Sequence, residues 1–371
     1  MTVALTLTPM DVARRATQLR ERFDEAECQA LVVTNLVNIR YLTGFTGSAA
    51  VLVVTPGELV LVTDGRYRDQ AGDQLAAAGV GARIEMAQTV AERQELLGAA
   101  VGGIRRLGLE AAHVSWSVSR RYAEEWFPEA ELVPTEGLVE DLRPHQDEGE
   151  IARLAAAAAL ADAALACVRH RLGDGPTEAE FALELDSEVR RLGADGASFE
   201  TIVASGPNGA RPHARPGPRP IAEGDLVVID FGALGDGDHS NMTRTTRVGE
   251  ASPTQRRMLE VVTASQAAGV RAVAGGVKSS AVDGACRAVI DEAGWLDAFL
   301  HSTGHGVGLD IHEDPRVATT STAILKPGHV VTVEPGVYLA EHGGVRIEDT
   351  VVVTASGSRL LTHAPKDPYL T

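Results

Sequence analysis

The C-terminal part of the chain contains two apolar segments, Thr332-Val333-Glu334-Pro335-Gly336 and Val345-Arg346-Ile347-Glu348-Asp349. Each alternates with the two-residue period of a β-strand, which predicts that both glutamates point to the inner face of a sheet. A carboxylate buried there is costly unless a cation or hydrogen-bond donors compensate its charge. Glu334 and Glu348 are therefore candidate metal ligands, although a surface ion pair such as Arg346 with Asp349 explains the same pattern.

Two earlier segments add polar side chains of the same kind. In Val227-Val228-Ile229-Asp230-Phe231 an aspartate follows an apolar run, and in Thr303-Gly304-His305-Gly306 a histidine lies between glycines, which allow close backbone approach. Taken alone, Asp230 is best interpreted as an ordinary strand-end aspartate at the surface, whereas the several glycine and histidine positions around His305 speak against an incidental glycine-rich loop. His301 lies one helical turn before His305 or on a nearby turn. Together, the acidic residues and the histidine suit one or two divalent ions, Mn²⁺ first and then Co²⁺, Zn²⁺ or Fe²⁺.

The rest of the chain predicts two domains, residues 1–140 and 141–371. The first reads as an alternating α/β unit, with a helix that Thr8 caps and Pro9 begins. The second contains several strands at hairpin-like spacing, which predicts an α+β domain with a largely antiparallel sheet and helices on one face. Its helices are expected over 150–172, from Thr177, from Ser252 and over 280–293, and its strands over 200–204, 226–231, 329–334, 345–353 and 359–363.

The composition excludes several classes of partner. The net charge of −17 repels phosphate backbones and acidic lipids, so neither nucleic acid nor a membrane is expected to bind. The cysteines, Cys28, Cys167 and Cys286, lie in stretches expected to be helical and form no C-x-x-C pair, which speaks against disulfides and a zinc-thiolate site. The start lacks signal-peptide order, and the apolar run 154–168 is interpreted as too short and too weakly apolar to span a bilayer. We therefore expect a cytoplasmic protein.

These motifs, taken in order, resemble a known family. Asp230-Phe231-Gly232, Asn241-Met242-Thr243-Arg244-Thr245, His312-Glu313 and the segments quoted above resemble the pita-bread metallopeptidases of family M24, which include methionine aminopeptidase, aminopeptidase P and prolidase. Asn38-Ile39-Arg40-Tyr41-Leu42-Thr43-Gly44 and Thr63-Asp64-Gly65-Arg66-Tyr67 look like the N-terminal domain shared by aminopeptidase P, prolidase and creatinase. The resemblance covers nearly the whole chain and implies a pita-bread C-terminal domain after a smaller creatinase-like α/β domain.

The resemblance also implies the site. Residues that match the family's metal ligands are Asp230, Asn241, His305, Glu334 and Glu348. It implies that His213 orients substrate or handles a proton, and that His312 stabilises the developing oxyanion or shuttles a proton. Glu334 or Glu348 would take the proton of the attacking water, and Glu334 is the residue that we predict to be catalytic. His301, Tyr338 and Arg346 would line the substrate pocket.

Position 241 departs from the family pattern, which has an aspartate that binds both metals. Asn241 offers one good oxygen, and its amide nitrogen is a donor that faces a cation badly. The formal ligand charge falls from four negative to three, which weakens the second metal more than the first. Two metals at lower affinity, one metal, an inactive site and an engineered substitution all remain open.

Three functions follow as expectations. The first is a metal-dependent exopeptidase, an aminopeptidase or dipeptidase that cleaves Xaa-Pro bonds of short peptides with proline second. The second is a binding module that is a catalytically impaired or inactive relative of these enzymes, and Asn241 is the observation that suggests it. The third is a metal-free hydrolase resembling creatinase, against which the acidic ligand set speaks. A homodimer is expected, in which Arg66 and Tyr67 pack within their domain or contact a second subunit.

Overall fold

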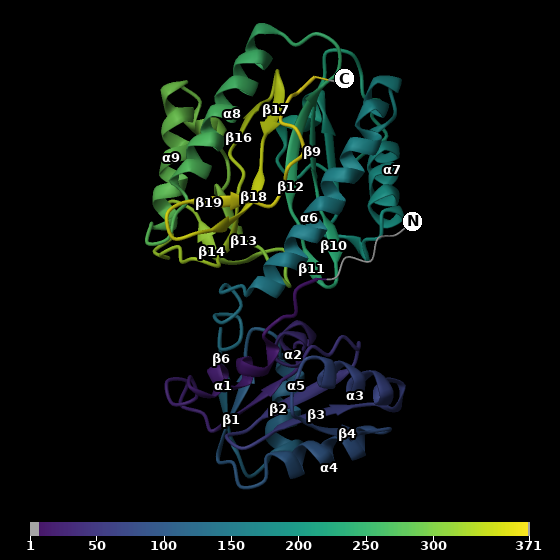
Figure 1. Cartoon of the computed structure of the whole chain (residues 1–371), viewed down its shortest axis with the longest axis vertical. Helices are drawn as coiled ribbons and strands as arrows, with labels where there is room; N and C mark the ends of the chain where they lie inside the picture. The colour runs from purple at the N-terminus through teal and green to yellow at the C-terminus, as the bar shows by residue number, and fades with distance from the viewer. Residues whose placement is uncertain (1–6, 370–371) are drawn as a thin grey trace. The chain divides into compact units, whose positions relative to one another are not determined.

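The structure is a computed structural model that describes residues 7–369. The chain divides into two compact units, residues 10–143 and residues 144–369, the latter together with residues 7–9 (Figure 1). The division into domains 1–140 and 141–371 remains a proposal for the limits of the folding domains.

The first unit is built on one mixed six-stranded sheet of order β4-β3-β2-β1-β5-β6. Strand β1 pairs antiparallel with β2 and parallel with β5. A hairpin joins β2 to its antiparallel partner β3, and helical connections join the parallel pairs β3–β4 and β5–β6. The strands are β1 Ala30–Val33, β2 Ala50–Val54, β3 Leu59–Thr63, β4 Arg83–Met86, β5 Arg106–Glu110 and β6 Glu131–Thr135, and the α-helices are α1 Arg15–Arg20, α2 Leu36–Thr43, α3 Arg68–Ala77, α4 Val90–Ala100 and α5 Trp116–Arg121.

The second unit contains two pairs of long helices, α6 Glu148–Val168 with α7 Glu178–Arg191 and α8 Pro253–Ala272 with α9 Ser279–Glu292. The capping boxes predicted at Thr177 and Ser252 are confirmed, since each hydroxyl accepts from the backbone three residues on and each Glu or Gln side chain returns the bond. Figure 1 shows the two pairs on opposite sides of the strands. The α+β class is confirmed.

All strand pairs of the second unit are antiparallel, as predicted. They form the ladders β11-β10-β7, β12-β9-β8, β14-β13-β15-β18-β19 and β16-β17. Their bounds are β7 Gly196–Ala197, β8 Ile202–Ser205, β9 Leu226–Phe231, β10 Ala233–Gly235, β11 Asp238–His239, β12 Met242–Arg247, β13 Gly304–Gly306, β14 Glu313–Val317, β15 Val330–Val333, β16 Gly336–Leu339, β17 Gly343–Arg346, β18 Asp349–Val353 and β19 Ser358–Leu360.

Each helix pair of the second unit covers its own strands. Leu165 of α6 and Phe181 of α7 pack with Ile229 of β9, whereas Val262 of α8 and Cys286 of α9 belong to a second apolar cluster that includes residues of β15, β17 and β18. All of these side chains are almost fully buried. The two apolar clusters thus support the β9–β12 ladder and the β15–β18 ladder, which carry the polar residues predicted to form the site.

Several local predictions were wrong. No helix begins at Pro9; the first helical turn spans Val12–Arg14 after Asp11, and Cys28 lies in a loop before β1. The segment predicted as one strand over 345–353 is two strands, because the β-structure is interrupted at Ile347-Glu348 between β17 and β18. His301 is not one helical turn before His305, since the chain after His301 is irregular and then enters strand β13 at Gly304.

The prediction that the apolar segment of helix α6 cannot span a bilayer also needs correction. Helix Glu148–Asp174 is long and apolar enough to cross a membrane by length and composition, so the prediction that it is too short was wrong. A core helix passes the same test, and Leu154, Ala161 and Leu165 are buried within the second unit. The helix is therefore weak evidence for a membrane.

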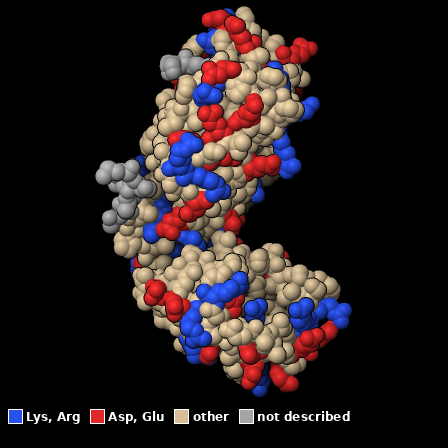
Figure 2. All heavy atoms as spheres, turned by 90° about the vertical axis from the view of Figure 1, so that its right-hand side faces the viewer, with Lys and Arg blue, Asp and Glu red and all other residues tan. Residues whose placement is uncertain are grey.

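The charged side chains on the face shown in Figure 2 are mixed. Acidic and basic residues alternate there without a broad basic surface. A phosphate backbone binds to continuous basic surfaces, and this face of the molecule has no such surface among the residues that the structure describes.

His329 gives the second unit a pH-dependent stability. Its ring lies 4.9 Å from that of His145 and is 6% exposed. Burial, followed by the neighbouring charges of His145 and Lys326, lowers the pKa of His329 to about 4. The unfolded chain, with an ordinary histidine pKa of about 6.5, therefore binds more protons than the folded chain between these two values. This contribution to stability is complete above pH ~6.5 and is lost as the pH falls toward ~4.

We expect the melting temperature of chelator-treated wild-type protein to fall more steeply over this window than that of His329→Gln. Differential scanning calorimetry at a series of pH values measures both slopes. Equal slopes would contradict the assignment of this pH dependence to His329.

Candidate metal centre

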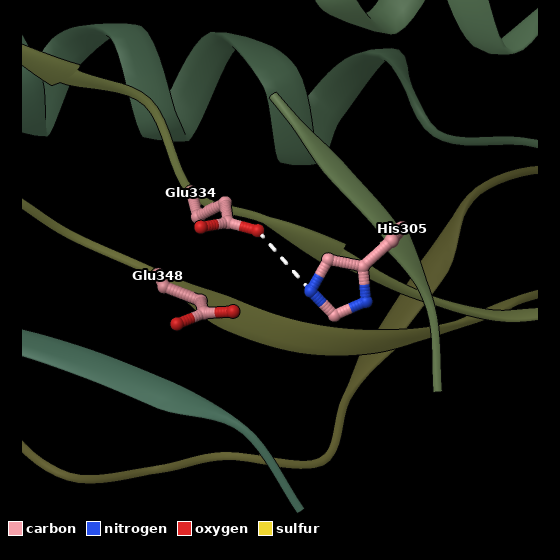
Figure 3. A group of neighbouring side chains, drawn as sticks. All are labelled: His305, Glu334 and Glu348. Atoms are coloured by element: carbon pink, nitrogen blue, oxygen red, sulfur yellow. Dashed lines mark ion pairs between the residues drawn. The ribbon is translucent and has the colours of Figure 1, made fainter. Parts of the chain in front are cut away.

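The strand register of the second unit brings the two glutamates together. Val333 of β15 pairs with Asp349 of β18, so in an antiparallel pair the next residue on one strand, Glu334, faces the previous residue on the other, Glu348. The backbone N–H of Glu334 donates to the carbonyl of Thr303 at 2.7 Å, which places β13 with His305 beside them. Three separate segments thus converge, as Figure 3 shows.

Glycines allow this approach of β13. A Cβ atom added at Gly304 would lie 2.1 Å from the carbonyl oxygen of Thr332, and one at Gly306 would lie 2.2 Å from that of Asp314. Both distances are far below contact, so β13 fits between β14 and β15 only with glycine at these positions. The glycines flanking His305 are therefore needed for its placement.

The convergence has the dimensions of a metal centre. One potential ligand atom each of His305, Glu334 and Glu348 lies within 4.8 Å of the others, and His305 Nε2 is 3.4 Å from Glu334 Oε1. His305 Nδ1 donates to the carbonyl of Gly306 at 2.9 Å, which leaves the lone pair of Nε2 free to bind a cation. The imidazole is thus oriented as a ligand.

The other two predicted ligands come from the β9–β12 ladder. Asp230 lies on β9, and Asn241 immediately precedes β12, whose Thr243 pairs with Asp230. Asn241 Nδ2 lies 3.5 Å from His305 Nε2, and both Asp230 and Asn241 line the same pocket as His305 and Glu334. Glu348 lies behind this lining and is fully buried. The structure therefore brings all five predicted ligands together.

The electrostatics of this cluster fit a divalent cation. Burial, followed by the charge of Asp230, raises the pKa of Glu334 to about 8, and burial with the charge of Glu334 raises the pKa of Glu348 well above its ordinary value. Burial lowers the pKa of His305 to about 4. The cluster without a cation thus disfavours both its carboxylate charges and an imidazolium, so a bound cation would relieve the repulsion.

Three oxygens of the cluster lack hydrogen-bond partners in the part of the chain that the structure describes. They are Asp230 Oδ1, Asn241 Oδ1 and Glu348 Oε1, and all three are buried. A buried polar atom without a partner costs free energy that folding must offset. Oxygen donors together with one imidazole nitrogen are the ligands that Mn²⁺, Fe²⁺, Co²⁺ or Zn²⁺ takes, so the residues fit such an ion.

Residues 152–355 match Metallopeptidase family M24, and residues 15–145 match the Creatinase/Prolidase N-terminal domain. The chain belongs to metallopeptidase family M24. The fold is accordingly the family's pita-bread domain preceded by a creatinase-type domain, as predicted from the resemblance.

Several relatives of this M24 chain match it over nearly its whole length. An uncharacterized peptidase of Bacillus subtilis (strain 168), YqhT, is 40% identical over 354 residues, which are 94% of this chain and 98% of the relative. The solved Xaa-Pro dipeptidase from Bacillus anthracis is 38% identical with a TM-score of 0.92, covering 95% of this chain and 98% of that one. The X-Pro aminopeptidase from Thermotoga maritima MSB8 is 31% identical with a TM-score of 0.86, covering 93% and 99%.

The remaining predicted residues of the M24 chain lie around the same pocket. His213, His301, His312 and Arg346 line it, and the rings of His305 and His312 are 4.4 Å apart. Burial, followed by the charge of Arg316, lowers the pKa of His312. The predicted histidines therefore surround the candidate ligands on the open side.

Arg346, Tyr338 and His301 form a chain of hydrogen bonds, and Tyr338, which was predicted to line the pocket, is not among its lining residues. Arg346 donates to the hydroxyl of Tyr338 at 2.7 Å and to Asp230 Oδ2 at 2.6 Å, and the Tyr338 hydroxyl lies 2.8 Å from His301 Nε2. His301 Nδ1 donates to the carbonyl of Ser302, so its Nε2 accepts from the hydroxyl. Tyr338 is thus held by Arg346 on one side and holds His301 on the other.

Sequence reasoning missed part of the pocket wall. Arg316 lies only four residues after His312, and this proximity was the available signal for it. The apolar residues carried no such signal, since apolar side chains are common in any core. The missed lining residues are Phe199, Ile202, Pro212, Ser302, Ile311 and Arg316.

Proposed function

We propose that this M24 protein is a metal-dependent exopeptidase that hydrolyses the bond between an N-terminal residue and a following proline in short peptides. Asp230, Asn241, His305, Glu334 and Glu348 hold one or two divalent ions, Mn²⁺ in the first place. The observation that carries the proposal is the convergence of these buried side chains with three oxygens that lack partners among the described residues. The match to a metallopeptidase family favours it over a metal-free hydrolase.

The chemistry divides between the cation and the side chains. When bound, a divalent ion supplies Lewis acidity, which eases deprotonation of a water and polarises the scissile carbonyl. Glu334 accepts the proton of the attacking water and delivers it to the leaving nitrogen, a role that needs a carboxylate at the pocket surface. Thr332 donates to Glu334 Oε1 at 3.1 Å and holds this carboxylate in place.

The pocket histidines act on the substrate. His312 stabilises the negative charge that develops on the carbonyl oxygen, and His213 orients the peptide. Arg346 and Tyr338 fix the position and tautomer of His301, whose side chain is then a rigid wall for the substrate.

The pocket supports a short substrate with proline. Its volume of about 220 Å³ is below the roughly 300–1,000 Å³ of common ligand pockets. Phe199, Ile202 and Ile311 give it an apolar surface on which a proline ring can pack. Relatives named Xaa-Pro dipeptidase and X-Pro aminopeptidase add support for cleavage before proline.

The direct test is hydrolysis by chelator-treated protein to which Mn²⁺ is returned. We expect cleavage of Ala-Pro, little cleavage of Ala-Ala, and none of N-acetyl-Ala-Pro, because the free N-terminus is part of the recognised group. Product release is followed by chromatography, with Co²⁺ and Zn²⁺ as further arms. The proposal fails if no metal restores cleavage of any Xaa-Pro peptide.

Arg316 supports a preference for dipeptides over longer peptides. Arg316 and Arg346 both line the pocket, and Arg346 is paired with Asp230, so the guanidinium of Arg316 is the one proposed to bind the C-terminal carboxylate of a dipeptide. We expect Arg316→Met to raise KM for Ala-Pro about fivefold, the size of an exposed ion pair, and to leave KM for Ala-Pro-amide unchanged.

Steady-state kinetics on both peptides measures this difference, and Arg359→Met on exposed β19 is the control. A similar rise in KM for the amide would speak against a carboxylate contact.

We also propose a location and an assembly for the protein. Cys28, Cys167 and Cys286 are all unpaired, which supports a reducing compartment such as the cytoplasm. A homodimer is proposed as the assembly, and sedimentation velocity tests it.

A further inference from the structure

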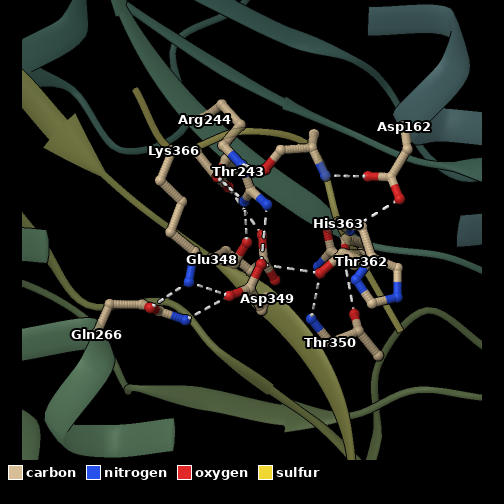
Figure 4. A network of polar contacts seen from close by, with 12 residues as sticks. Asp162, Thr243, Arg244, Gln266, Glu348, Asp349, Thr350, Thr362, His363 and Lys366 are labelled. Atoms are coloured by element: carbon tan, nitrogen blue, oxygen red, sulfur yellow. Dashed lines mark hydrogen bonds and ion pairs between the residues drawn. The ribbon is translucent and has the colours of Figure 1, made fainter. Parts of the chain in front are cut away.

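Asp349 lies next to Glu348, on the side away from the pocket, and is fully buried. Its Oδ1 accepts from Arg244 and from the Thr362 hydroxyl, each at 2.9 Å. Its Oδ2 accepts from Gln266 at 2.9 Å and from Lys366 Nζ at 2.5 Å. This buried carboxylate is therefore bound by four donors, two of them cationic (Figure 4).

Arg244 connects Asp349 to the backbone of Glu348. Its Nη1 donates to the carbonyl of Glu348, and its Nε donates to the carbonyl of Ala364 at 2.9 Å. The N–H of Glu348 donates to the carbonyl of Thr243, the neighbour of Arg244 on β12, at 3.1 Å. Because Ile347-Glu348 lies between β17 and β18, these bonds to β12 replace a strand ladder in fixing the glutamate.

Hydrogen bonds also connect the residues around Asp349 to a second candidate ligand, Asn241. The hydroxyl of Thr350 donates to the backbone carbonyl of Asn241 at 2.7 Å, and the N–H of Thr350 donates to the hydroxyl of Thr362 at 3.2 Å. Thr362 and Lys366 both belong to the C-terminal segment after β19, and Figure 4 shows their side chains beside Asp349. The C-terminal segment is thus bonded to the elements that carry Glu348 and Asn241.

We propose that Arg244, Asp349, Thr362 and Lys366 form a positioning cluster, through which the C-terminal segment holds Glu348 and Asn241 at ligand geometry. The proposal rests on the proposed metal-dependent function. Removing Lys366 leaves the buried Asp349 with one cation, Arg244. Arg244 then shifts toward Asp349, its bond to the Glu348 carbonyl loosens, and the ligand set is less well ordered.

The test is Mn²⁺ affinity, measured on chelator-treated protein by the electron paramagnetic resonance signal of free Mn²⁺. We expect Lys366→Met to raise Kd about tenfold, the usual cost of losing a residue that orients a ligand, and Lys366→Arg to restore most of the affinity. Lys326→Met, at an exposed lysine outside the cluster, is the matched control and keeps the wild-type Kd. Lys366 is 31% exposed, so its replacement leaves the fold intact.

Calorimetry of the metal-free variants separates positioning from stability. A lower melting temperature with unchanged Kd in Lys366→Met would overturn the proposal, because the cluster would then be structural only. Thr362→Val, which keeps the size of the side chain, provides a second variant with the same expected direction. Wild-type protein that binds no Mn²⁺ would overturn the proposed function, and the positioning role with it.

Discussion

Replacing Glu334 by glutamine is expected to lower kcat/KM for Ala-Pro about 10³-fold, the midpoint of the loss typical for a group that transfers a proton. Glutamine has the same size but cannot accept the proton of the water, and it removes the negative charge that lies 3.4 Å from His305 Nε2 in the wild-type protein. Steady-state kinetics at saturating Mn²⁺ measures the loss. Glu341→Gln, at an exposed residue between β16 and β17, is the matched control and keeps wild-type activity.

The metal-free form of Glu334→Gln provides a check on folding. Glu334 is buried beside other carboxylates, so removing its charge leaves the melting temperature of metal-free protein no lower than that of wild type. A loss of activity with a normal melting temperature therefore reports on chemistry and metal binding. Activity within a few-fold of wild type would contradict the role given to Glu334.

Replacing Asn241 by aspartate is expected to have opposite effects on the metal-free and metal-loaded protein. The new carboxylate adds a fourth acidic ligand within the pocket that already contains Asp230 and Glu334. With Mn²⁺, we expect Kd to fall about tenfold or more, and activity to rise, because the amide nitrogen that faces His305 is replaced by an oxygen. Without metal, the new carboxylate repels the neighbouring carboxylates and lowers the free energy of unfolding. The melting temperature then falls by roughly 2–4 °C for each kcal/mol of unfolding free energy that is lost.

Isothermal titration with Mn²⁺ and calorimetry of chelator-treated protein measure the two effects. Gln18→Glu, an exposed position on α1, adds the same charge elsewhere and changes neither quantity. A gain of peptidase activity in Asn241→Asp would argue against a site that evolved for binding alone. Unchanged affinity and unchanged activity would instead favour the binding-module alternative.

Much of the second unit could be predicted because its signals are local. The capping boxes at Thr177 and Ser252 depend on residues three apart, and the strand Leu226–Phe231 is a continuous apolar run. The break at Ile347-Glu348 could not be predicted this way, since the alternation of β-forming residues continues through it. Its cause is the bonding of Glu348 to Thr243 and Arg244, which lie about a hundred residues earlier.

The sequence by itself determined the kinds of groups available: carboxylates after apolar runs, a histidine between glycines, and the asparagine Asn241. Only the tertiary structure decided which of them meet, because the register of Val333 with Asp349 places Glu334 beside Glu348. It also decided that Lys366 reaches Asp349. Local propensity acts between neighbours along the chain, whereas a metal centre requires strand pairings between segments that are far apart in it.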